Sequence, residues 1–192
     1  MIAYLNHWSG DGPAALRGQV RLLPHGAPLA LDGVRAVLVP AHADQRDLLA
    51  RRDTLQAFLF EGGTLVFNGH VAYPLLPWLS PFEPAAPAGL DGLRIHRAAE
   101  HPVFDGVLAE DLTFRRGVAG FYARGSNPPP PQAQVLNTIG PQRLPVDWLL
   151  TLPGGGRLLM HSGNDLWMYA GGQDSAARIV PQLLHWLQGE SA

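Results

Sequence analysis

The sequence predicts a single α/β domain of three layers: an open, mostly parallel sheet with helices on both faces, and a late β-hairpin. Three short, continuous apolar runs, at residues 2–5, 36–40 and 64–68, are typical of strands covered on both faces. Residues 47–61 have one apolar helical face and are followed by Gly62-Gly63, a helix C-terminal signal. Strand, helix and strand in this order form a βαβ unit, which favours parallel pairing.

The remaining elements are expected along the rest of one domain that covers residues 1–192. Strands 147–151 and 157–161, joined by a Gly-rich turn, form the hairpin, and 133–138 is a further strand. A closing helix is expected over 174–187, kinked or split by Pro181. Residues 124–134, which include four consecutive prolines, are predicted to be an exposed Pro-rich loop. Less regular segments predict short helices at 12–23 and 73–79 and a strand at 112–115.

Composition excludes several classes of function. The net charge is −2, lysine is absent and no basic run occurs, so nucleic acid is not an expected partner. Cysteine is also absent, which excludes disulfides, thiolate metal sites and a cysteine nucleophile. The N-terminus reaches polar residues too early for a signal peptide, and no apolar stretch is long enough to span a membrane. The cytoplasm is therefore the expected location, and the Gly-, Pro- and Arg-rich composition indicates a GC-rich bacterial coding bias.

Polar residues gather where the predicted strands end, which is where open α/β sheets bind ligands. Four of the eight histidines follow predicted strands: His7, His42, His70 and His161. Together with Asp165 they are candidate ligands for a divalent metal such as zinc, although no compact metal-binding spacing is present. Alternatively, one histidine acts as a general base oriented by Asp165 or Asp11. Ordinary solvation of strand ends explains the same residues equally well.

The segment Asn68-Gly69-His70 occupies the turn between a strand and the chain that follows it. Gly-x-Ser-x-Gly is absent and neither Ser nor Cys is nearby, so the turn is not a nucleophile elbow. Backbone amides and the Asn68 side chain could bind an anion or a carbonyl group there. Capping of a helix by Asn68 is an equally good interpretation.

Residues 161–167 form the segment richest in candidate site residues. Asn164 and Asp165 either shape a ligand-binding loop or cap a short helix over 167–169. Trp8, Tyr122 and Arg124 are candidates for the lining of a pocket, and Arg124 suits an anionic ligand. The two aromatic residues could equally belong to the core or to an interface.

Three segments carry a family resemblance. Residues 55–70, LQAFLFEGGTLVFNGH, resemble the helix, Gly-Gly and strand of the class I glutamine amidotransferase-like superfamily. Residues 101–107, HPVFDGV, are similar to the His-Pro-Ile-x-x-Gly-Leu segment of its ThuA-like branch, and residues 145–161 resemble the hairpin of that branch. The resemblance implies a flavodoxin-like sheet with helices on both faces.

The resemblance does not carry over the amidotransferase reaction. The position of the nucleophilic cysteine corresponds to about Phe67, and the expected glutamate two residues after His161 is replaced by Gly163. Glutamine hydrolysis through a thioester is therefore excluded. His161 does match the late-strand histidine of these enzymes.

Two classes of function follow. The favoured hypothesis is a non-catalytic member of the superfamily that binds a small molecule or a protein partner, with a homodimer allowed. The alternative is a hydrolytic or sugar-processing enzyme in which His70, His161 and Asp165 perform acid–base or metal chemistry. For either class the candidate ligand-binding residues are His7, Trp8, Asn68, Gly69, Tyr122, Arg124 and Asn164, and a divalent metal is the one cofactor considered.

Overall fold

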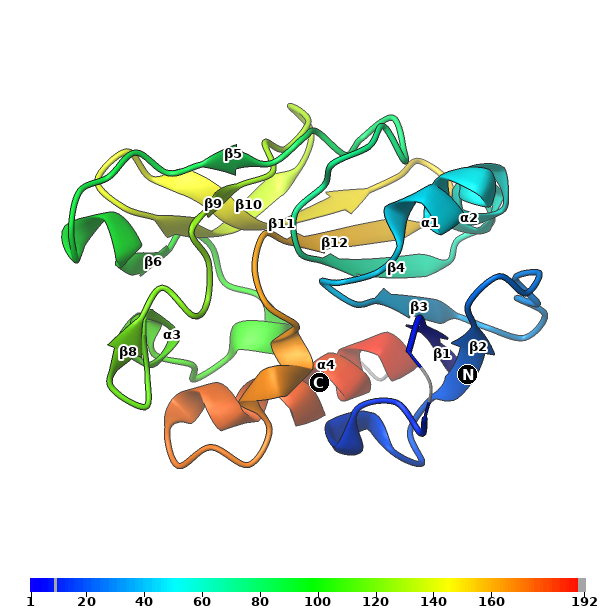
Figure 1. Cartoon of the computed structure of the whole chain (residues 1–192), viewed down its shortest axis with the longest axis horizontal. Coiled ribbons are helices and arrows are strands. Elements are labelled where there is room, and N and C mark those ends of the chain that lie inside the picture. Colours follow the sequence, from blue (N-terminus) through cyan, green and yellow to red (C-terminus); the bar gives the residue numbers. More distant parts are fainter. Residues whose placement is uncertain (9, 190–192) are drawn as a thin grey trace.

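An eight-stranded sheet forms the centre of the computed structural model, which describes residues 1–8 and 10–189 (Figure 1). Its strand order is β2-β1-β3-β4-β12-β11-β10-β6. Neighbours from β2 to β12 pair in parallel, and the pairs from β12 to β6 are antiparallel. The predicted α/β class with a mostly parallel sheet is thus confirmed. The strands of this sheet are β1 (Ile2–Asn6), β2 (Arg21–Pro24), β3 (Ala36–Val39), β4 (Thr64–Asn68), β6 (Ile95–Arg97), β10 (Gln134–Ile139), β11 (Leu144–Thr151) and β12 (Arg157–His161).

Helices cover both faces of this sheet. Helices α1 (Gln45–Ala50) and α2 (Arg52–Phe60) lie on one face, and α4 (Ile179–Gln188) lies on the other (Figure 1). Alternate strand residues feed two separate apolar clusters: Leu158 packs with the α1–α2 side, whereas Leu159 packs with the α4 side. This alternation follows from the two-residue period of a strand and gives the three predicted layers.

The helix predicted over 47–61 is two consecutive helices that meet at Arg51. The Asp44 side chain accepts hydrogen bonds from the backbone N–H groups of Arg46 and Asp47 and so caps α1. After α2, Gly63 lies under the ring of Phe58, where a Cβ atom would come within 2.4 Å of ring carbons. The Gly-Gly pair therefore lets α2 pack closely on the start of β4.

The closing segment divides into a 3-10 helix, Ser175–Arg178, and the continuous helix α4. Pro181 is the third residue of α4, where the first-turn N–H groups have no partner inside the helix, so the proline does not kink it. The Asp174 side chain accepts a hydrogen bond from the N–H of Ala176. Gly189 ends α4 in the left-handed region, at a φ of 77°.

The predicted hairpin is present as β11 and β12, and β12 also pairs in parallel with β4. The hairpin therefore lies inside the sheet and joins its parallel and antiparallel parts. Two short two-stranded sheets complete the structure, one of β5 (Glu83–Pro84) with β9 (Gly125–Ser126) and one of β7 (Phe114–Arg115) with β8 (Val118–Ala119).

Of three weaker predictions, one is wrong and two hold only in part. The segment 73–79 contains no helix, because Pro74 and Pro77 lack the N–H groups that a helix needs. Of the strand predicted at 112–115, Leu112 and Thr113 lie in helix α3 (Ala109–Thr113), where Thr113 Oγ1 donates to the carbonyl of Ala109 one turn earlier, and Phe114 and Arg115 form β7. Residues 12–23 form a 3-10 helix, Ala14–Leu16, and then β2.

The Pro-rich segment 124–134 is exposed only in part. Gly125 and Ser126 are buried in β9, Asn127 is fully buried, and residues 128–130 are half-buried. A Cβ atom on Gly125 would lie 2.3 Å from the carbonyl oxygen of Glu83, so glycine is required where β5 and β9 meet. The segment therefore packs back onto the domain before it reaches solvent.

Candidate functional site

A pocket of about 210 Å³ opens at the carboxyl ends of β3, β4 and β12. Residues 41–42, 69–70 and 163–164, which follow these three strands, line it together with residues 120, 121, 123 and 124. Parallel strands bring their carboxyl ends to one edge of the sheet, which explains why segments distant in sequence meet here. We refer to this cavity as the strand-end pocket.

Two glycines allow the backbone to form the floor of the strand-end pocket. Gly69 has a φ of 97°, and a Cβ atom there would lie 2.6 Å from the carbonyl oxygen of Ala41. Gly163 forms an antiparallel bridge with Ala123, and a Cβ atom on Gly163 would lie 1.7 Å from the carbonyl oxygen of Tyr122. A side chain at either position would push the floor of the pocket apart.

His42, His70 and Arg124 are the exposed charged or titratable side chains that line this pocket. The His70 ring stacks on Phe82 with the centroids 3.5 Å apart. Partial burial lowers the pKa of His70, and the nearby His42 and His161 lower it further. Arg124 Nε donates to the carbonyl oxygen of Gly120 at 3.1 Å. Arg124 thus brings a guanidinium group to this site.

Polar residues at the end of β4 and after β12 hold the strand ends together. Asn68 is buried, and its side chain donates to the carbonyl of Val39 and accepts from the N–H of Leu166. Asp165 accepts from the N–H of Ala41 at 2.6 Å, and burial raises the pKa of its carboxyl group. Asn164 Nδ2 donates to the carbonyl of Phe121 at 2.7 Å. Asn68 and Asp165 thus fix the backbone around the pocket, and neither side chain lines it.

A fully buried polar network lies behind the pocket floor and centres on Asp147 of β11. Its Oδ1 is 2.6 Å from Nδ1 of His161, and its Oδ2 accepts from the Tyr122 hydroxyl at 2.6 Å and from Asn137 Nδ2 at 2.7 Å. Burial and the Asp147 carboxylate raise the pKa of Tyr122 well above its usual value, so its hydroxyl stays protonated. Arg97 extends this network from Asn137.

His161 is inaccessible from the strand-end pocket. Its side chain is 0% exposed, and its Nε2 has no hydrogen-bond partner among the described residues. The backbone of Gly163 covers this atom, because a Cβ atom there would come within 2.8 Å of Nε2. Tyr122, predicted to line a pocket, is instead buried edge-on against the His161 ring.

Asn127 and Asp147 are central residues that sequence reasoning did not single out. Asn127 Oδ1 accepts from the N–H of Val71, its Nδ2 donates to the carbonyl of Gly69 and to Ser162 Oγ, and its own carbonyl accepts from Trp148 Nε1. An acidic residue between apolar neighbours in a predicted strand was an available signal for Asp147. For Asn127 the neighbouring prolines indicated only a loop.

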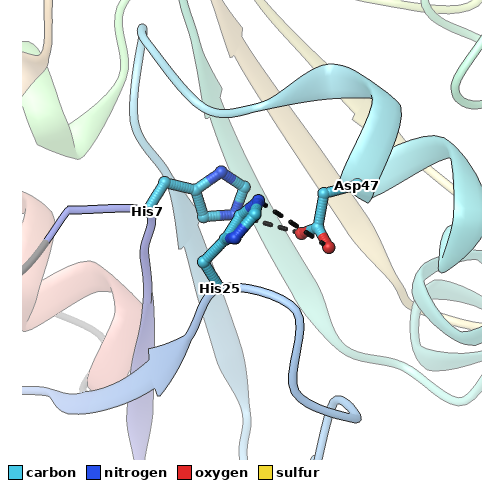
Figure 2. A group of neighbouring side chains, drawn as sticks. All are labelled: His7, His25 and Asp47. Carbon is cyan, nitrogen blue, oxygen red and sulfur yellow. Dashed lines mark ion pairs between the residues drawn. The ribbon is translucent and has the colours of Figure 1, made fainter.

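His7 belongs to a different cluster, with His25 and Asp47, at the ends of β1 and β2 and on α1 (Figure 2). The His7 side chain is 3% exposed, and its Nε2 lies 3.5 Å from Asp47 Oδ2. Its Nδ1 accepts a hydrogen bond from the N–H of Asp44 at 2.6 Å. Burial, His25 and the Arg51 guanidinium lower the pKa of His7 to about 4, so the ring is neutral at pH 7. Trp8 next to it is 66% exposed and does not line the strand-end pocket.

The donor set of this cluster does not suit a metal ion. Because Nδ1 of the neutral His7 ring accepts a hydrogen bond, the proton lies on Nε2, the atom that faces Asp47. An imidazole that binds a metal through one ring nitrogen normally carries its proton on the other ring nitrogen. In His7, the nitrogen that faces the cluster is the one that carries the proton. The Arg51 guanidinium also pairs with Asp47 and already supplies a cation. Of the four histidines predicted as metal candidates, His42 and His70 line the pocket, His161 is buried and His7 lies in this cluster.

Comparison with known proteins gives a match by fold. No family model matches the chain, and no curated protein matches it. Among solved structures, the chain is similar to one described as the mmIFT52 N-terminal domain, with a TM-score of 0.61 and 10% sequence identity. The alignment covers 100% of this chain and 99% of that one. At this identity the match shows a shared fold over the whole length.

This match corrects the resemblance drawn from short sequence segments. The fold that matches is that of the mmIFT52 N-terminal domain, so assignment to the amidotransferase-like superfamily or its ThuA-like branch is wrong. The function inferred from that membership is wrong with it, and the hydrolytic or sugar-processing alternative gains no support. The three segments resemble the family because strands, Gly-Gly turns and hairpins of this kind recur in many α/β folds. Among the described residues, no helix is long and apolar enough to cross a membrane.

Proposed function

We propose that this chain is a non-catalytic binding domain that recognises a protein partner at the strand-end pocket. The observation that carries the proposal is the state of the residues behind the pocket floor. Asp147, Tyr122 and Asn137 are fully buried and bonded to one another, and His161 Nε2 is covered by backbone. The residues best suited to acid–base chemistry therefore stabilise the fold and do not face a ligand.

The surface that remains at the pocket is suited to recognition. It consists of an arginine, two histidines, an asparagine and an aromatic ring around backbone provided by glycines. The hydroxyl of Ser162, which follows His161, is buried and accepts hydrogen bonds from Asn127. A buried, bonded hydroxyl is a poor nucleophile, because attack needs an exposed oxygen next to a base.

The shared fold supports the same proposal in a coarser way. The matched structure is, by its description, the N-terminal domain of mmIFT52 and thus one part of a larger protein. The five parallel strands follow the order β2-β1-β3-β4-β12, which is the order of flavodoxin-like sheets, and such sheets bind ligands at the carboxyl ends of their strands. We further propose that the parallel half of the sheet is flavodoxin-like and that the protein is located in the cytoplasm.

Photo-crosslinking in living cells of the organism that makes this protein tests the proposal. A benzophenone amino acid replaces His42 on the rim of the pocket, and in a matched protein it replaces Asp53, whose side chain is 94% exposed on α2. We expect a discrete adduct with one protein from position 42 and none from position 53. An adduct with a second copy of the chain would identify a homodimer as the partner complex. The same adducts from both positions, or none from position 42, would contradict the proposal.

A further inference from the structure

Arg124 is a cation without an acidic partner at the mouth of the strand-end pocket. Its Nε donates to Gly120, and no hydrogen bond or ion pair of its terminal amino groups is found among the described residues. Most other arginines near the sheet ends are engaged, for example Arg51 with Asp47 and Arg97 with Asn137. An exposed guanidinium that keeps two amino groups available at a concave surface is suited to bidentate binding of an anion.

The backbone around the pocket favours a singly charged anion over a phosphate. Phosphate sites use several free backbone N–H groups at once. Here the N–H of Gly69 donates to the carbonyl of His161, and the N–H groups of Val71 and Ala72 donate to the side chains of Asn127 and Gln45. The N–H of Ala41 donates to Asp165. These four N–H groups are therefore not free to bind a phosphate, and Arg124 supplies a positive charge to the pocket.

The walls of the pocket suit an anion that is attached to an apolar group. Phe121 lines one side, and His70, stacked on Phe82, lines another. The volume of about 210 Å³ is below the range of about 300–1,000 Å³ that pockets for drug-sized ligands have. A single amino-acid residue fits such a space, whereas a folded segment does not.

We propose that the strand-end pocket binds the carboxylate of a peptide segment of the partner, with Arg124 as its principal ligand. The inference rests on the proposed function and names the chemistry recognised there. The guanidinium pairs with the carboxylate, the rings of His42 and His70 offer N–H groups at the rim, and the apolar walls contact the residue that carries the carboxylate. Asp165, whose pKa is raised by burial behind the pocket, is held by the N–H of Ala41.

Titration of the full chain with small peptides, followed by NMR of the histidine ring protons at pH 7, tests this inference. N-acetyl-Gly-Leu presents a terminal carboxylate, N-acetyl-Glu-amide presents a side-chain carboxylate, and N-acetyl-Gly-Leu-amide presents neither. We expect one of the two carboxylates to shift the His70 and His42 signals and the amide to leave them unchanged. Which carboxylate binds distinguishes a C-terminus from an acidic side chain as the source.

Variants of the arginine locate the binding. Arg124→Ala is expected to weaken binding of the carboxylate by about tenfold or more, and Arg124→Lys to recover only part of it, because lysine keeps the charge but loses the planar pair of donors. Arg52→Ala, on the exposed face of α2, serves as the matched control and should bind as the unmodified chain does. Equal binding by the Arg124→Ala variant would overturn the inference.

Two further outcomes would also overturn the inference. Both can be distinguished from an outcome that contradicts the proposed function. Saturable binding of inorganic phosphate with no binding of either carboxylate would identify a phosphate ligand. Absence of any shift, while the crosslink from position 42 persists in the Arg124→Ala protein, would show a partner that docks without this ion pair. Loss of the crosslink in the otherwise unmodified protein would contradict the proposed function itself.

Discussion

At the scale of single residues, the buried carboxylate of Asp147 holds three other side chains in place. We expect Asp147→Asn to lower the free energy of unfolding by about 3 kcal/mol, because the amide cannot accept from His161 and Tyr122 while it also faces the donor of Asn137. Urea denaturation measures the change. Asp53→Asn, at an exposed position, should be neutral. A similar small change in both variants would show that the network contributes little to stability.

Gly163 gives a second prediction at this scale, since its backbone touches Tyr122 more closely than any side chain permits. Gly163→Ala should destabilise the protein by about 3 kcal/mol and distort the pocket floor. Gly172→Ala is the matched control, because there a Cβ atom would meet nothing closer than 3.4 Å. Thermal unfolding compares the two variants. Equal melting temperatures would mean that the backbone at the bridge between Ala123 and Gly163 shifts to admit the Cβ atom at little cost in free energy.

The residue scale is also where sequence reasoning was weakest. The strand ends could be found from apolar runs, so His42 and His70 could be proposed as neighbours, and the structure places both on one pocket. The local sequence does not show which polar side chains are buried and hydrogen-bonded inside the fold and are therefore unavailable to a ligand. His161 is a strand-end histidine like the others, yet its burial depends on Tyr122 and Gly163, which reach it through long-range packing.

At the scale of elements, His7 links the end of β1 to the start of α1 by accepting from the N–H of Asp44. Its pKa of about 4 in the folded chain is below the value of about 6.5 in an unfolded chain. The unfolded state therefore binds more protons in this interval, and stability falls as the pH decreases from about 6.5 to about 4. His101, whose pKa is also lowered to about 4 by burial and Arg157, acts in the same direction.

Urea denaturation at pH 7.5 and at pH 5 measures this dependence. We expect a lower free energy of unfolding at pH 5, and a smaller difference between the two pH values in His7→Gln, since glutamine keeps an acceptor but does not titrate. His25→Gln, which removes one neighbour that contributes to the lowered pKa of His7 but leaves His7 buried, should reduce the difference less than His7→Gln does. A difference in His7→Gln as large as that of the unmodified chain would show that His7 is not a source of the pH dependence.

The sequence could predict those elements whose apolar pattern is complete within one short stretch of the chain. Strands β4 and β12 were predicted at their observed bounds, and β1 and β3 within one residue at their C-terminal end. Edge strands β2 and β6 were missed because they are short and only partly buried, so no continuous apolar run marks them. Helix α3 was misassigned because Leu112 and Thr113 fit a strand as well as a helix, and the bond from Thr113 to Ala109 decides between them.

At the scale of the whole molecule, two apolar layers share one sheet, and this arrangement predicts a single cooperative unit. Leu158 and Leu159 are neighbours on β12, both fully buried, and they face opposite layers. Replacement of either by alanine should cost about 2–5 kcal/mol, because each leaves a cavity in a closed core. Since β12 lies between β4 and β11, loss of either layer removes support from the other.

We therefore expect Leu158→Ala and Leu159→Ala to shift the whole unfolding transition, with far-UV circular dichroism and tryptophan fluorescence giving coincident curves in each variant. The exposed Leu108→Ala, whose side chain is 62% exposed, is the control and should leave the midpoint nearly unchanged. A second transition in one variant only, seen by one probe and not by the other, would show that the α1–α2 layer and the α4 layer unfold independently. In that case the sheet would not couple the unfolding of the two layers, and each layer would unfold as a separate cooperative unit.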